Sequence, residues 1–137
     1  MIEQLTVFIE NADGRLTALC RALADAQVNM RALVVADTSE YGIVRIICDD
    51  AARGRKALSQ AGFRAACAEV VAVEVPDRPG GLAQVLSALD DAQIGLEYGY
   101  CFTGRDGAAL VALKASEEAE GVLEAAGFAV VSGEGPA

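Results

Sequence analysis

The amino-acid sequence predicts an α+β protein made of two βαββαβ units, chiefly because one pattern occurs twice. Residues 11–16 align with residues 77–82 at an offset of 66, and seven of the 21 residues from position 11 to 31 are identical to their counterparts. After a one-residue slip, residues 61–63 align with residues 126–128 at an offset of 65. A duplication of about 65 residues is close to a small domain in size. We therefore expect two domains, residues 1–69 and 70–137.

The spacing of apolar residues predicts the elements of the first unit. Residues 5–9 form a short β-rich apolar run, and apolar residues at helical spacing predict a helix over residues 14–27. Residues 29–37 and 42–49 indicate a hairpin. Asp49 or Asp50 is expected to cap a second helix that ends near Gly62, and residues 63–69 form the last strand.

The second unit repeats this order. Residues 71–75 form a strand, a turn follows at Pro79 and Gly80, and a helix with the same apolar spacing comes next. Residues 95–103 and 108–114 indicate a hairpin, Ser116 is expected to cap the next helix, and residues 128–131 close the unit. This order is typical of the ferredoxin-like fold, in which an antiparallel sheet carries both helices on one face.

Composition narrows the class of protein. The chain has 137 residues, of which 53% are hydrophobic, which is enough for a substantial core. No apolar stretch approaches the roughly 20 residues that cross a bilayer, and no basic segment followed by an apolar run stands at the start. We expect a soluble cytoplasmic protein that does not bind membranes.

Charge and residue usage disfavour several functions. The net charge is −9, and an acidic surface repels phosphate backbones, so no nucleic-acid partner is expected. The four cysteines include no CxxC pair and are expected to be reduced thiols. The absence of histidine removes the commonest general base and most zinc sites. We expect neither an enzyme nor a bound metal or cofactor.

Each unit places a glycine-containing turn between its first strand and its first helix. Backbone N–H groups at a helix start point outward at the positive end of the helix dipole, so such a turn suits a carboxylate. The amide of Asn11 can both donate and accept hydrogen bonds, which matches an ammonium beside a carboxylate. The alternative is that Asn11 and Asp77 merely cap helices and the glycines merely turn the chain.

The sequence of these turns resembles the ACT-domain signature. Residues 11–16 read Asn-Ala-Asp-Gly-Arg-Leu and residues 26–30 read Ala-Gln-Val-Asn-Met, with Gln27 where that family usually has glycine. Residues 77–82 and 92–96 are similar in the second unit. The resemblance covers nearly the whole chain, which also looks like the stand-alone tandem ACT proteins of bacteria. It implies regulatory binding of a small ligand, most often an amino acid, at an interface between ACT units.

The resemblance also implies where a ligand is bound. The positions carried over are Asn11, Ala12, Asp13, Gly14, Arg15, Leu16, Asn29 and Met30 in the first unit and Asp77, Gly80, Gly81 and Leu82 in the second. Gly95 stands where the first unit has Asn29, so the two sites are expected to differ. Tyr98 and Tyr100 share one sheet face and either line the ligand site or cover the sheet in a dimer.

Three functional hypotheses follow. The first is a non-catalytic amino-acid sensor, as the resemblance implies, that acts alone or by contact with a metabolic enzyme. The second is an enzyme on a ferredoxin-like scaffold, which the missing histidine and nucleophile motifs disfavour. The third is a structural or interaction module with vestigial pockets. A homodimer is expected in either non-catalytic case, because a ferredoxin-like sheet leaves an open face and edges.

Overall fold

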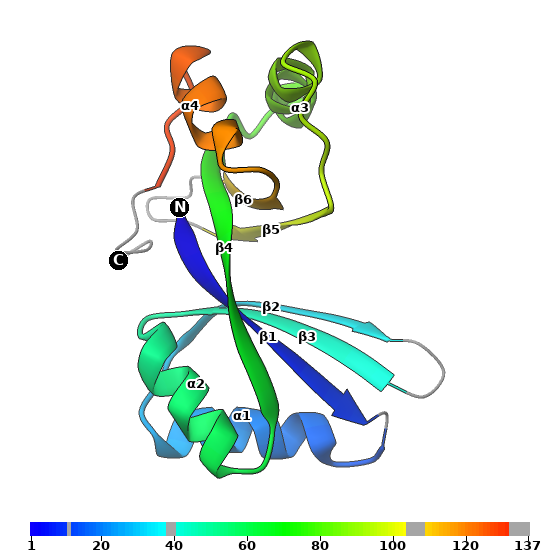
Figure 1. The fold of residues 1–137 in the computed structure, drawn as a ribbon, viewed down its shortest axis with the longest axis vertical. Helices are drawn as coiled ribbons and strands as arrows, with labels where there is room; N and C mark the ends of the chain where they lie inside the picture. Colours follow the sequence, from blue (N-terminus) through cyan, green and yellow to red (C-terminus); the bar gives the residue numbers. More distant parts are fainter. Residues whose placement is uncertain (11, 38–40, 104–108, 132–137) are drawn as a thin grey trace. The chain divides into compact units, whose positions relative to one another are not determined.

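The computed structural model describes residues 1–10, 12–37, 41–103 and 109–131. The chain folds as two compact units, coloured along the sequence in Figure 1. The N-terminal unit comprises Glu3–Ala68, and the C-terminal unit comprises Glu69–Ala137 together with Met1–Ile2. The first residues belong to the C-terminal unit because the α-ammonium of Met1 pairs with Glu120 and the Met1 side chain packs against that unit's core.

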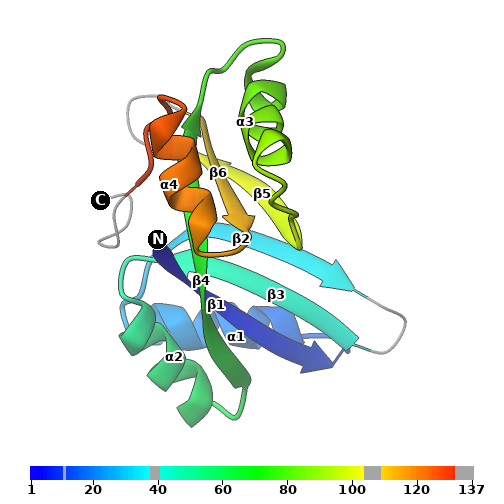
Figure 2. The ribbon, with the colours of Figure 1, turned by 45° about the horizontal axis from the view of Figure 1, so that its top comes forward.

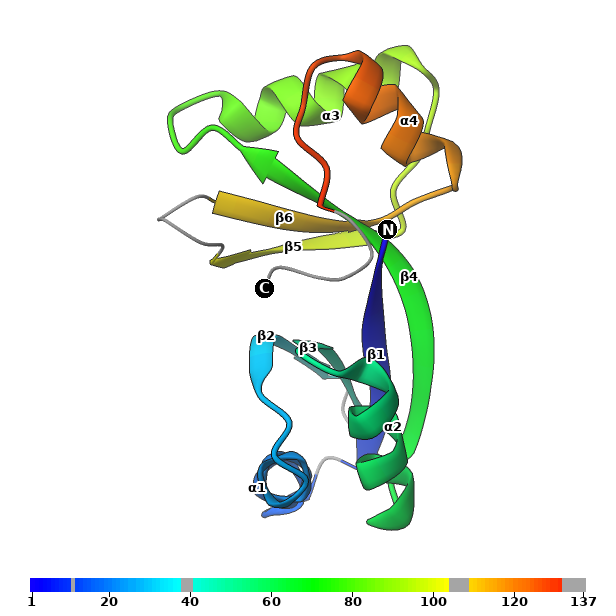
Figure 3. The ribbon, with the colours of Figure 1, turned by 90° about the vertical axis from the view of Figure 1, so that its left-hand side faces the viewer.

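The N-terminal unit has the predicted order of strands and helices. It contains β1 (Ile2–Glu10), α1 (Arg15–Asp25), β2 (Met30–Asp37), β3 (Tyr41–Cys48), α2 (Ala51–Gln60) and the first part of β4 (Arg64–Val75). The strand order is β2-β3-β1-β4, and β3 pairs antiparallel with both β1 and β2. Figure 3 shows α1 and α2 on one face of these strands. This arrangement is the ferredoxin-like fold.

The C-terminal unit is built in the same way. It contains the second part of β4, α3 (Gly81–Asp91), β5 (Tyr98–Thr103), β6 (Ala109–Lys114) and α4 (Glu118–Ala125). β6 pairs antiparallel with β4 and β5, and α3 and α4 lie next to each other on one face, as Figure 2 shows. Within the described residues, the strand predicted over residues 128–131 is a single bridge of Val130 with Val73, and the N–H of Val131 donates to the carbonyl of Ala72. The predicted α+β, ferredoxin-like class is therefore confirmed.

Each unit has its own apolar core between sheet and helices. In the N-terminal unit, Leu5 and Val7 of β1 pack with Leu19 and Leu23 of α1 and Leu58 of α2. In the C-terminal unit, equivalent positions on β4, α3 and α4 form a second cluster. Burying a side chain of this size contributes about 1.5–3 kcal/mol. The two repeats therefore hold their helices in place by separate sets of contacts.

The structure differs from the predicted elements at several places, among them β1 and β5, which span Ile2–Glu10 and Tyr98–Thr103 where residues 5–9 and 95–103 were predicted. The two strands predicted over residues 63–69 and 71–75 form one continuous strand, β4, because neither glycine nor proline interrupts residues 64–75. The helix predicted from residue 14 to 27 spans Arg15–Asp25. The predicted Ser116 cap is not formed, because α4 begins after Glu117 without a side-chain cap. The predicted turn over residues 38–41 lies largely outside the described residues, as do residues 104–108.

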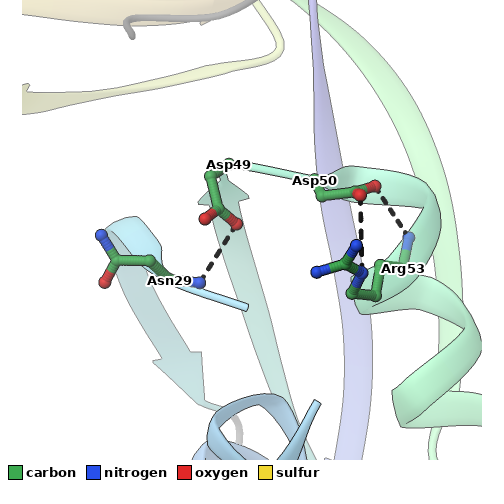
Figure 4. A network of polar contacts seen from close by, with 4 residues as sticks. All are labelled: Asn29, Asp49, Asp50 and Arg53. Atoms are coloured by element: carbon green, nitrogen blue, oxygen red, sulfur yellow. Dashed lines mark hydrogen bonds and ion pairs between the residues drawn. The ribbon is translucent and has the colours of Figure 1, made fainter. Parts of the chain in front are cut away.

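The start of α2 carries the predicted aspartate cap. Asp50 Oδ1 accepts a hydrogen bond of 3.0 Å from the backbone N–H of Arg53, and Figure 4 shows this contact beside the ion pair of the same two side chains. None of the helices in the described part of the chain is long and apolar enough to span a membrane.

Candidate functional site

The two strand-to-helix turns have the same backbone conformation. Gly14 has φ 82° and Gly80 has φ 85°, a left-handed conformation that glycine adopts without steric cost. In the first turn, the N–H of Arg15 donates to the carbonyl of Ala12 at 3.3 Å. In the second, the N–H of Gly81 donates to the carbonyl of Arg78 at 3.0 Å. The duplicated motif thus encodes a duplicated turn.

The residue before each of these helices is a glycine, and no described residue of the two turns provides a side-chain cap. α1 begins after Gly14 and α3 after Gly80, with no capping hydrogen bond from either residue and no acidic residue in either first turn. The first N–H groups of a helix lack intrahelical acceptors and carry partial positive charge. Gly14 and Gly80 are exposed, so a carboxylate can approach these groups.

The predicted turn residues have different surroundings. Ala12 and Asp13 are exposed, whereas Leu16 packs against the core of the N-terminal unit. In the second turn Asp77 is exposed, and Leu82 is an exposed large apolar residue. Asn11, which the resemblance places at the centre of the first site, lies outside the described residues.

Within the N-terminal unit, Asn29 and Met30 lie at the other end of the sheet from the first turn. Tyr41, at the start of β3, pairs with Glu10 beside the turn, whereas Met30 pairs with Cys48 at the end of β3. Figure 4 shows the backbone N–H of Asn29 donating to Asp49 Oδ1 at 3.1 Å, so the side-chain amide of this exposed residue is not used there. Met30 packs against the core.

In the C-terminal unit, Tyr98 likewise lies at the end of the strands away from the second turn. It pairs with Lys114 at the end of β6, whereas Val75, next to the turn, pairs with Ala109 at the start of β6. Tyr100 pairs with Ala112, so the two tyrosines share one face of β5, as the alternation along a strand predicts. A single unit therefore does not bring its turn residues together with the strand-opening residues.

A groove lies beside the first turn, within the N-terminal unit. It is lined by the end of β1, the first residue of α1, the start of β3 and the segment between α2 and β4. Its chemically distinctive lining residues are Phe8, Glu10, Arg15, Tyr41, Phe63 and Arg64. The groove has a volume of about 540 Å³, within the range of small-molecule pockets.

Arg15 connects the predicted turn to this groove. Its guanidinium carbon lies 4.4 Å from the centre of the Phe63 ring, which is a cation–π contact. At the equivalent position of the second turn stands Gly81, where an added Cβ would lie 2.0 Å from the carbonyl oxygen of Pro76. The second turn thus has no room for a side chain at this position, so the two turns differ chemically.

Two of the cysteines, Cys48 and Cys67, have raised pKa values. Burial raises the pKa of Cys48 to about 11, and the nearby Asp49 and Asp50 carboxylates act in the same direction. Burial also raises the pKa of Cys67, with a smaller opposing effect of Arg55. A raised pKa keeps a thiol protonated and weakly nucleophilic. No cluster of three metal-ligating side chains occurs among the residues that the structure describes.

The predicted residue set contains Arg15 but omits the rest of the groove. Tyr41 is a surface residue, 59% exposed, and it lines the groove at the start of β3. One signal was present in the sequence: Leu5, Val7 and Ile9 alternate toward the core, so the aromatic Phe8 falls on the opposite face, where a polar residue is usual. Arg64 carries no comparable signal.

Comparison with known proteins agrees with the repeat and the turns. The family model described as "ACT domain pair" matches residues 1–133. The crystal structure of protein BT0572 from Bacteroides thetaiotaomicron is similar, with 32% identity, a TM-score of 0.91 and coverage of 97% of this chain and 93% of that one. No protein of curated function matches the chain.

Two regulatory subunits of aspartate kinase have a similar fold. The ligand-free subunit from Thermus thermophilus is 16% identical with a TM-score of 0.67, and covers 90% of this chain and 89% of its own. The subunit from Thermus flavus is 17% identical with a TM-score of 0.62, and the match covers 90% of this chain and 88% of that one. The family match over almost the whole chain, the duplicated fold and the paired glycine turns show that this protein belongs to the ACT domain pair family.

Proposed function

We propose that the protein is a non-catalytic regulatory protein that binds a free amino acid where ACT units meet. The observation that carries this proposal is the pair of left-handed glycine turns, each of which opens a helix in an ACT unit with glycine as the residue before the helix. The folds of two regulatory subunits of aspartate kinase support a regulatory role. The chain also has no histidine for general acid–base chemistry.

The positions of the predicted residues support a site made by more than one unit. The first turn and Asn29 lie at different ends of the N-terminal unit, so one ligand contacts both only if they come from two units. In the second turn, Asp77 offers a carboxylate for an ammonium, but Gly95 lacks the amide that Asn29 provides. We therefore expect the turn of the N-terminal unit to bind more tightly.

A ligand of this kind regulates by favouring one packing of units over another. The shift in that equilibrium equals the difference in its affinity for the two arrangements. A metabolic enzyme in contact with the protein would sense which arrangement prevails. This mechanism requires no covalent chemistry from the protein itself.

Thermal unfolding in the presence of each of the twenty amino acids and related 2-oxo acids tests the proposal. A ligand at 100 times its dissociation constant adds about 2.7 kcal/mol, which raises the Tm by several degrees. Asn29→Ala and Asn11→Ala are each expected to weaken binding, while Asn29→Asp retains part of it. Unchanged affinity in both alanine variants refutes the assignment of these two residues.

The edge of the N-terminal sheet supports a second copy of the chain as partner. β2 is the terminal strand of its unit, and Leu33 and Val35 on it are 42% and 46% exposed. Both pair with core residues of β3, so these side chains extend the helix-side apolar face to the edge. Such an edge is a template for pairing with another strand. We propose a homodimer formed through β2.

The oligomeric state tests this second proposal. Light scattering or sedimentation is expected to show a dimer at micromolar concentration. Val35→Lys should shift the protein toward monomer. The control variant Ala24→Lys, at an exposed residue of α1, should leave the oligomeric state unchanged. A monomer at high micromolar concentration contradicts the proposal. If no amino acid shifts the Tm either, the alternative function as an interaction module for another protein is favoured.

A further inference from the structure

The groove beside the first turn has a composition that the fold does not require. Phe8 and Tyr41 are 49% and 59% exposed, although aromatic rings are normally buried. Two guanidinium groups, from Arg15 and Arg64, and the carboxylate of Glu10 line the same groove. Apolar walls with a few converging charged groups are typical of sites for small molecules.

The C-terminal unit shows which of these groove residues the fold itself requires, because it has the same fold with other residues at the equivalent positions. The backbone features recur in the C-terminal unit: Gly62 and Gly127 both have left-handed φ values, and Phe63 corresponds to Phe128. The residues with distinctive chemistry do not recur. At the offsets of the repeat, Phe8, Glu10, Arg15 and Arg64 correspond to Glu74, Pro76, Gly81 and Ala129. The fold is therefore built without these four side chains in one unit and with them in the other.

We propose that this groove is a binding site for an amino acid with an aromatic side chain. The proposal rests on the amino-acid-binding part of the proposed function, names the ligand class, and places the ligand in a groove within the N-terminal unit in place of a site where units meet. Arg64 and Arg15 supply N–H donors for the α-carboxylate, a pairing for which the guanidinium geometry is well suited. Glu10 accepts hydrogen bonds from the α-ammonium. The exposed rings of Phe8 and Tyr41 contact the aromatic side chain of the ligand.

Arg15 is held in position for this role. Its guanidinium carbon lies over the ring of Phe63, 4.4 Å from the ring centre. The ring attracts the positive charge, and the five N–H donors of the guanidinium are more than this contact occupies. The contact limits the positions that the guanidinium adopts, which reduces the ordering required when a carboxylate binds.

The site differs from the one that the family resemblance implies. It uses the side of the turn that faces β3 and the segment between α2 and β4, and it does not use Asn29. It also lies within one unit. Substitution of Arg64 and of Asn29 therefore separates the two sites.

Isothermal titration of the full chain with L-phenylalanine is the test. L-alanine, which lacks the ring, is expected to bind at least about tenfold more weakly, the effect of losing burial of a large apolar group. Arg64→Ala reproduces the residue of the second unit and should lower the affinity for L-phenylalanine by at least about tenfold, the effect of losing a charge-assisted hydrogen bond. Arg53→Ala removes an exposed guanidinium outside the groove and should leave affinity within about twofold.

Glu10→Gln distinguishes an amino acid from the corresponding 2-oxo acid. This substitution should weaken the binding of L-phenylalanine but not that of phenylpyruvate, because only L-phenylalanine carries an ammonium group. If Arg64→Ala and Phe8→Ala leave affinity unchanged while Asn29→Ala lowers it, the groove assignment is overturned and the proposed function stands. If none of the twenty amino acids binds the unsubstituted protein, both fail.

Discussion

The guanidinium carbon of Arg15 lies 4.4 Å from the centre of the Phe63 ring, which joins the first residue of α1 to the residue before β4. This contact connects two segments far apart in the chain at the edge of the candidate groove. Because Arg15 is only half-buried, the contact contributes modestly to stability.

We expect Arg15→Ala to lower the free energy of unfolding by about 0.5–1 kcal/mol, the usual worth of a cation–π pair that water partly screens. Urea unfolding measures the loss. Arg21→Ala removes an exposed arginine from the same helix and should have a smaller effect. In a Phe63→Leu background the loss on Arg15→Ala should shrink; an equal loss in both backgrounds would show that the ring contributes nothing.

Gly81 should not tolerate a side chain. A Cβ at this position would lie 2.0 Å from the carbonyl oxygen of Pro76, so the turn or the helix must move. We expect Gly81→Ala to lower stability by about 1–3 kcal/mol or more, as for other overpacked sites. Gly121 is the matched control, because it lies in α4 with open space around its Cβ position. Gly121→Ala should raise stability by up to about 1 kcal/mol, and thermal unfolding of both variants compares them.

The Asp50 cap should contribute measurably to α2. Its carboxylate accepts from the N–H of Arg53 at 3.0 Å, so Asp50→Ala leaves that donor to water and should cost about 1 kcal/mol. Asp50→Asn keeps an acceptor and should cost less. Glu117→Ala serves as the control, because Glu117 precedes α4 without a capping hydrogen bond. Equal losses in Asp50→Ala and Glu117→Ala, measured by urea unfolding, would contradict the cap.

Stability should fall at alkaline pH because of Cys48. Burial raises the pKa of this thiol from 9.0 to about 11, so between these values the unfolded chain loses the proton and the folded protein keeps it. The stabilisation is complete below pH 9 and is lost as pH rises through 11. Urea unfolding from pH 8 to 11 should show a shallower decline in Cys48→Ala. Identical pH profiles would show that the thiol does not contribute.

The sequence predicted the fold class because both repeats carry local signals. Glycine turns, helical spacing and alternating strands occur in the same order twice. The element predicted in one repeat is therefore supported by the equivalent element of the other repeat. Boundaries were less well predicted. The continuous β4 was divided in two because the duplication suggested a break at residue 69, although no residue there interrupts a strand.

The candidate site was predictable only where local sequence builds it. The turns at Gly14 and Gly80 follow from their motifs, and Arg15 was included with the first of them. Arg64 and Tyr41 could not be found in this way, because they approach the turn through pairing of β3 and β4 with elements distant in sequence. Register, which places Tyr41 opposite Glu10, is a property of the sheet and not of either segment alone.

The sequence by itself determined the duplicated βαββαβ order, the glycine turns and the small number of reactive groups, because these depend on residue type and short-range spacing. The tertiary structure decided which side chains share a surface. It placed two arginines, a glutamate and three aromatic rings around one groove in the N-terminal unit. It also placed Asn29 at the end of the N-terminal sheet that lies away from the turn of its own unit. Strand register and helix packing bring distant residues together, and spacing along the chain does not encode those distances.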